Sequence, residues 1–155
     1  MRFMIGIGFA GMVGLAALLA PAIAHMGATG VVKERMELML DLGKTAKALN
    51  AMARGKVAYD GPAVMRAAKL IEGHSAKMPT MFPEGSMKPP SEARPEISTN
   101  MKEFRGLATA LKAEAVALAE VGRNGDRAAL AKQFRRIGKA CSACHKTFRS
   151  KKRRK

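Results

Sequence analysis

This 155-residue chain has few aromatic residues and no long alternating pattern of polar and apolar side chains. It contains no Trp, one Tyr and six Phe. A half-buried strand needs period-two alternation, and strands are enriched in aromatic and β-branched residues. No segment offers that combination, so the sequence argues against a sheet of any kind.

Cysteine is also scarce, and the chain has only Cys141 and Cys144. They stand in the run Cys141-Ser142-Ala143-Cys144-His145, and Cys-x-x-Cys-His is the attachment sequence of c-type haem. The two thiols add across the vinyl groups of the haem, and the next residue offers an imidazole to the iron. On a helix turning ~100° per residue, positions 141, 144 and 145 share one stripe. The sequence therefore predicts one covalent haem c with His145 as an iron ligand, and it leaves no cysteine for a disulfide.

The motif has three other interpretations: a redox dithiol, half of a zinc site and a structural pair. A redox dithiol usually follows a strand and opens a helix, and that context is absent here. A zinc site needs further Cys or His ligands at short spacing. The remaining histidines, His25 and His74, lie far from the motif in the sequence.

The N-terminus predicts export. Arg2 precedes an uncharged run from Phe3 to Ala24, and Pro21 stands before the small-x-small triplet 22–24. We expect a secretory signal over residues 1–24, cut after Ala24, which leaves one domain over 25–155 in the periplasm. The alternative is an uncleaved inner-membrane anchor facing the periplasm, because the run is nearly long enough to span a bilayer.

Acidic residues are few, with 12 Asp and Glu against 28 Lys and Arg and a net charge of +16. In a cytoplasmic protein this balance would suggest nucleic acid, but predicted export argues against that partner. An acidic redox protein is a better candidate, and peripheral contact with an anionic membrane is a second one. We expect the basic tail over residues 151–155 to be a solvated end.

Four segments show helical periodicity, and proline marks the loop between the second and third. The helices are expected from about Gly30 to Ala53, from Asp60, from the region of Ile97, and from Asp126 through the haem motif. Ser98 and Thr99 are possible N-caps of the third helix. The predicted inner stripe of the first helix is Val32, Met36, Met39, Gly43 and Ala46. That of the third is Ile97, Met101, Phe104, Ala108, Leu111, Ala115 and Leu118. The prediction is an all-α, antiparallel four-helix bundle with covalent haem on its last helix.

At this point the chain resembles the cytochrome c′ family of c-type cytochromes. The resemblance covers essentially residues 30–150. It is most specific at 141–149, where the haem motif lies near the C-terminus, and Ala93-Arg94-Pro95-Glu96-Ile97 and Met81-Phe82-Pro83 are similar to the family's middle segments. The resemblance implies the bundle fold, one haem c and a haem contact at Phe82. It also makes a homodimer possible.

The resemblance further implies what lies on the distal side of the iron. Family members place a residue there one helical turn after an arginine of the first helix, and Arg35 and Met39 match those positions. Low-spin members use a methionine as the distal ligand, and high-spin members leave the site open to small gases. Arg35 would then lie near a haem propionate. Periodicity alone is more typical of Met39 as a core residue, because methionine commonly fills cores.

The sequence therefore favours a non-enzymatic electron carrier with His145 and Met39 as axial ligands. The alternative is a high-spin protein that binds NO or CO at an open distal site. No acid–base group is expected near the iron, and His74 is expected to face solvent.

Overall fold

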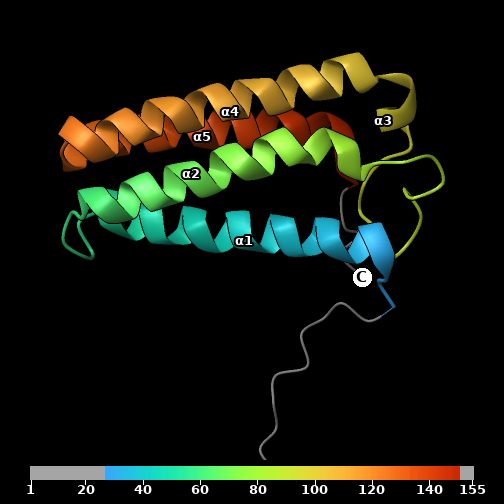
Figure 1. Cartoon of the computed structure of the whole chain (residues 1–155), viewed down its shortest axis with the longest axis horizontal. Helices are drawn as coiled ribbons and strands as arrows, with labels where there is room; N and C mark the ends of the chain where they lie inside the picture. Colours follow the sequence, from blue (N-terminus) through green and yellow to red (C-terminus); the bar gives the residue numbers. More distant parts are fainter. Residues whose placement is uncertain (1–26, 151–155) are drawn as a thin grey trace, which may run out of the picture.

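The computed structural model describes residues 27–150, which form an elongated bundle of four long helices and two short ones (Figure 1). Consecutive long helices run antiparallel, and the described residues form no strand beyond one isolated bridge. The predicted leader and the basic tail lie outside the described residues. The helices are α1 (Gly30–Ala53), α2 (Gly61–Lys77), the 3₁₀ turn η1 (Met78–Met81), α3 (Glu96–Thr99), α4 (Met101–Asn124) and α5 (Arg127–Phe148).

Two aspartates start helices as the sequence predicts. The side chain of Asp60 accepts a hydrogen bond from the backbone N–H of Ala63 (2.9 Å), and Asp126 accepts one from Ala129 (2.8 Å). Each carboxylate satisfies a backbone donor that has no partner within the first helical turn. Both N-caps are confirmed.

The start of the third predicted helix is wrong, because neither Ser98 nor Thr99 is its N-cap and the stripe from Ile97 is interrupted at Asn100. The short helix α3 ends at Thr99, and α4 begins at Met101. Between them Asn100 leaves the helical region, and its amide nitrogen donates to the carbonyl of Glu96 (2.9 Å). Asparagine commonly bonds nearby backbone groups in this way, which favours caps over helix interiors.

The inner stripe of the first helix is also corrected. The buried residues of α1 are Arg35, Leu38, Leu49 and Met52. Met39 lies at the edge of this stripe and is half-buried, whereas Gly43 is exposed. The prediction failed because it used apolar residues only and so did not consider Arg35 as a buried residue. With Arg35 buried, a different face of the helix points inward.

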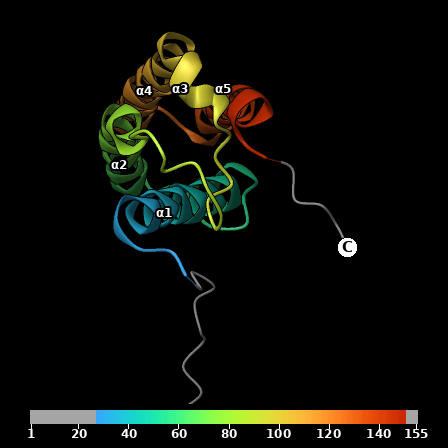
Figure 2. The ribbon, with the colours of Figure 1, turned by 90° about the vertical axis from the view of Figure 1, so that its right-hand side faces the viewer.

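The tightest packing joins α2 and α4, which lie side by side in both views (Figure 2). At their crossing, a Cβ added to Gly61 would lie 2.5 Å from the carbonyl oxygen of Gly122. Only glycine permits such a backbone approach. The inner stripe of α4 is confirmed from Phe104 to Leu118. By contrast, α1 makes fewer close contacts with its neighbours α2 and α5.

The length and apolar character of a helix decide whether it can span a membrane. Within residues 27–150, no helix combines the length and apolar character needed for a membrane span.

Candidate haem site

The Cys-x-x-Cys-His motif lies in the last two turns of α5. Cys141 and Cys144 are half-buried, unpaired, and packed against the hydrophobic core, while His145 is exposed. The helix thus turns both sulfur atoms to the apolar interior. This arrangement suits attachment of a flat apolar macrocycle to one side of α5.

Burial keeps the two thiols protonated. Desolvation raises the pKa of Cys144 to about 11, with further contributions from Cys141 and Glu103, and desolvation also raises the pKa of Cys141. A redox-active dithiol needs the opposite shift, because its thiolate is the nucleophile. Within residues 27–150, no group of three or more His, Cys, Asp and Glu could hold a metal ion. The raised pKa values of the two thiols favour haem attachment over the redox interpretation.

The surroundings of His145 favour the form of its side chain that can bind iron. Although the side chain is exposed, partial desolvation lowers its pKa, and the nearby Arg149 lowers it further. Glu92 acts in the opposite direction and offsets part of this effect. The result favours neutral imidazole, whose free nitrogen is a metal ligand.

The loop before α3 fastens the C-terminal end of α5. The backbone N–H of Arg94 donates to Phe148 O (2.9 Å), and its guanidinium donates to Thr147 O (3.0 Å). The Nε atom of Arg149 donates a hydrogen bond to the carboxylate of Glu92 (2.7 Å), and the backbone N–H of Ser150 donates one to the Glu92 carbonyl (2.8 Å). The family-like segment 93–97 therefore fixes the position of the haem-motif helix.

Arg35 is the most unusual side chain near this end of the bundle, because it is only 4% exposed. Its Nη1 donates to Met81 O (2.9 Å) and Ser86 Oγ (3.2 Å), and its Nη2 donates to Ser86 O (2.9 Å) and Ser91 Oγ (2.7 Å). The guanidinium carbon lies 4.4 Å from the ring centroid of Phe82. Burial lowers the pKa of Arg35. Within the described residues, no carboxylate pairs with this buried cation.

The other predicted haem contacts lie close to this core. Phe82 is buried, and its ring meets Phe104 edge-on at 4.7 Å; Phe104 meets Phe148 in the same way at 5.3 Å. Three aromatic rings thus connect the loop to the last turn of α5. Met39 is half-buried and packs against the same hydrophobic core as the two cysteines.

Several polar residues that make hydrogen bonds between distant segments were not predicted. Ser86 and Ser91 lie in the loop, where no periodicity marks an inward side chain. Gln133 is buried on α5 and donates from Nε2 to the carbonyl oxygen (2.8 Å) and a carboxylate oxygen (2.7 Å) of Glu114. It could have been found from its position on the apolar stripe, three residues after Leu130 and four before Ile137.

The expectation for His74 is wrong, because it does not simply face solvent. Its side chain is 28% exposed, and its Nε2 atom is shielded and lies 4.0 Å from Asp41 Oδ2 of α1. The antiparallel pairing of α1 and α2 brings these residues together. Antiparallel packing was predicted, but the contact between these two residues was not.

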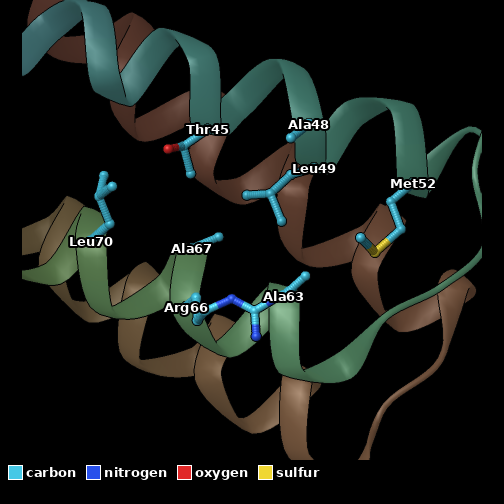
Figure 3. A pocket seen from close by; sticks show the side chains of 8 residues that line it. All are labelled: Thr45, Ala48, Leu49, Met52, Ala63, Arg66, Ala67 and Leu70. Atoms are coloured by element: carbon cyan, nitrogen blue, oxygen red, sulfur yellow. The ribbon is translucent and has the colours of Figure 1, made fainter.

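A hollow of about 240 Å³ lies between α1 and α2 (Figure 3). Neither this hollow nor a second one, of about 210 Å³ beside residues 85–90, is lined by the cysteines or His145. The first is lined by Thr45, Ala48, Leu49, Met52, Ala63, Arg66, Ala67 and Leu70. The site is therefore recognised by its chemistry: two inward thiols with raised pKa values, an imidazole with a lowered pKa and a buried cation. These features fit an apolar macrocycle with anionic propionates.

Comparison with known proteins gives a consistent result. The family profile described as "Cytochrome C'" matches residues 30–149. A "Cytochrome c-556" of Agrobacterium tumefaciens (strain II Chrys) is 35% identical over 124 residues, covering 79% of this chain and 99% of the relative.

Solved structures agree with these sequence matches. Cytochrome c′ from Rhodopseudomonas palustris superimposes with a TM-score of 0.75 at 28% identity, covering 81% of this chain and all of that one. A nitric oxide complex of a mutant of cytochrome c prime from Alcaligenes xylosoxidans gives a TM-score of 0.70 at 25% identity, covering 78% and 94%. The bundle, the inward cysteines and the match over nearly all of the described chain lead to one conclusion: this chain belongs to the cytochrome c′ family and binds one covalent haem c.

Proposed function

We propose that the protein is a periplasmic electron carrier whose haem iron has His145 and Met39 as axial ligands. When bound, the haem supplies reversible one-electron chemistry between ferric and ferrous iron. The leader-like residues 1–24 and the haem motif support the periplasmic location. No enzymatic role is proposed, because peroxidase-like chemistry would call for an acid–base group near the iron.

The observation that supports Met39 most directly is its place on α1. It lies one helical turn after the buried Arg35, at the edge of the inward face. It packs against the core that also receives Cys141 and Cys144, and α1 contacts α5 along the bundle. We infer from this that a haem held by α5 would meet the thioether of Met39.

The surrounding residues favour electron transfer over ligand capture. A neutral imidazole and a thioether would fill both axial positions, so the iron would change little in geometry on reduction. Thioether ligation raises the reduction potential relative to two imidazoles. Apolar burial disfavours the more positive ferric state and acts in the same direction. Arg35 contributes a buried positive charge that can pair with a propionate.

The visible spectrum of the wild type and of two methionine variants tests this proposal. Wild-type protein should be low-spin in both redox states. Met39→Ala should become high-spin and bind CO rapidly when reduced. Met36→Ala is the matched control, because Met36 is also half-buried on α1, and its spectrum should stay low-spin. A high-spin wild type, or equal spectra for wild type and Met39→Ala, would show that Met39 is not a ligand.

The gas-binding alternative is favoured by the nitric oxide complexes of mutants of the similar Alcaligenes xylosoxidans protein. In that case Met39 would pack over an open iron site without ligating it. Rapid CO binding by the reduced wild type at neutral pH would support this alternative.

A further inference from the structure

Helix α5 differs from the other long helices in the sign of its charges. It carries six basic side chains and no acidic one between Arg127 and Phe148. The other long helices mix the two signs: four basic and three acidic residues in α1, three and one in α2, and four and three in α4. The basic excess of the described helices is therefore concentrated on the helix that bears the haem motif.

Five of these basic residues share one face, which we call the α5 outer face. They are all exposed: Lys132, Arg135, Arg136, Lys139 and Lys146. At ~100° per residue they span about 100° of the helix surface. The middle of that span lies opposite the buried stripe of Leu130, Ile137 and Phe148. The outer face therefore points away from the core along most of α5.

No ion pair within residues 27–150 involves any member of the α5 outer face. The nearest ion pair along the chain is Arg149–Glu92, just beyond the end of α5. Elsewhere, basic residues of α1, α2 and α4 pair with acidic ones, as in Lys33–Glu37, Lys77–Glu34 and Lys112–Glu72. Five like charges on one face repel one another, and only an external partner could neutralise them.

The α5 outer face lies close enough to the haem motif for electron transfer to a protein docked on it. Lys139 and Lys146 flank the motif cysteines along α5, and the whole helix is ~10–12 Å across with its side chains. A protein docked on the outer face would thus lie about one helix diameter from the haem attachment points.

We propose that the α5 outer face is the docking surface for an acidic redox protein that exchanges electrons with the haem. This proposal rests on the proposed electron-carrier function and assigns the partner's place on the molecule. Opposite charge would steer the partner to this face and raise the association rate at low salt. Insertion of α5 into a membrane is disfavoured, because interfacial helices bury an apolar face in lipid. The apolar face of α5 is already buried in the bundle.

Charge reversal on α5, compared with matched reversal elsewhere, tests the proposal in the haem-loaded protein. The test variant is Lys132→Glu, Arg135→Glu and Lys139→Glu. The control variant is Lys47→Glu, Lys69→Glu and Arg105→Glu on the other three long helices. Both sets are exposed, include two lysines and one arginine, and make no ion pair within the described residues. They change the net charge equally, so only the place of the change differs.

The measurement is stopped-flow reduction of the ferric protein at the haem absorption band. The donors are a reduced acidic [2Fe–2S] ferredoxin and, for comparison, an uncharged quinol. At low ionic strength the α5 variant should lose about tenfold or more in its second-order rate with ferredoxin. The control variant should lose less than about threefold. The difference should shrink in about 0.5 M salt because screening is then strong, and the quinol rate should stay unchanged in all proteins.

Several outcomes would overturn the docking assignment. Equal losses in the two variants would show that only net charge matters. A parallel loss with quinol would place the effect at the haem itself. If the α5 variant lost binding to vesicles containing phosphatidylglycerol but kept its ferredoxin rate, the face would belong to a membrane contact. A wild type reduced by quinol but not by ferredoxin would refute docking alone, whereas a high-spin wild type reduced by neither donor would refute the electron-carrier function as well.

Folding of the variants is checked by helical content and by the haem spectrum. If the glutamate variant unfolds, the neutral Lys132→Gln, Arg135→Gln and Lys139→Gln variant replaces it. That variant should show a smaller loss in the same direction, and an unchanged ferredoxin rate would contradict the proposal.

Discussion

The two ends of the bundle are held together in different ways. At the end with the α1–α2 and α4–α5 turns, called here the turn end, backbones touch directly at Gly61 and Gly122. At the opposite end, called here the motif end, an irregular segment over 82–95 is fastened by side chains, chiefly the guanidinium of Arg35. Backbone contact leaves no room for a ligand, whereas a side-chain network can surround one. The difference therefore matches the position of the haem motif at the motif end.

The largest effect is expected from removing an aromatic ring at the motif end. Phe104→Ala should lower the free energy of unfolding by about 3–5 kcal/mol, because Phe104 is fully buried between the rings of Phe82 and Phe148. Denaturant unfolding measures the change. Val116→Ala on the same helix is the control, since Val116 is 47% exposed. A loss near zero for Phe104→Ala would mean that the aromatic rings do not hold the motif end.

The second test removes the polar fastening at the motif end. Arg35→Met should cost about 2–4 kcal/mol, because Met81, Ser86 and Ser91 would lose a charged hydrogen-bond donor. Arg35→Lys should also destabilise, since an ammonium cannot reproduce the planar fork. The control is Arg54→Met, an exposed residue with one side-chain bond to Asn50. Full stability of Arg35→Lys would show that charge alone is needed here.

The third test addresses the turn end. Gly61→Ala should cost about 1–3 kcal/mol, because its Cβ would overlap the backbone of Gly122. Gly106→Ala is the matched helical control, since nothing lies within 4 Å of a Cβ built there. It should stabilise the protein by about 0.5–1 kcal/mol. Thermal and denaturant unfolding separate the two, and equal shifts would contradict close backbone packing at the turn end.

The smallest effect is expected from the ion pair between Glu92 of the loop and Arg149, just beyond the end of α5. Glu92→Gln should cost about 0.2–1 kcal/mol at low salt, because the Glu92–Arg149 pair is partly exposed. The cost should fall in high salt. Glu72→Gln breaks a longer pair with Lys112, at 3.8 Å between α2 and α4, and should cost less. A larger loss for Glu72→Gln would place the more important ion pair away from the motif end.

Local sequence signals predicted the regular parts of the fold well. The two aspartate caps, the limits of α1 and the inner stripe of α4 follow from short-range rules and were confirmed. The haem motif could be identified without any structure, because its five residues are contiguous. The break at Asn100 and the buried side of α1 were not predicted. The first depends on the hydrogen bond that the Asn100 side chain makes to Glu96, and the second depends on the burial of Arg35. The spacing of apolar residues shows neither.

The sequence by itself determined the helices, the haem motif and the excess of basic residues, because each is encoded within a few neighbouring positions. Only the tertiary structure decided that Arg35 is buried and that its guanidinium donates hydrogen bonds to Ser86 and Ser91. It also decided that the side chain of His74 lies beside that of Asp41. These residues come from distant parts of the chain. Whether a polar side chain is buried depends on partners that only the folded bundle brings together.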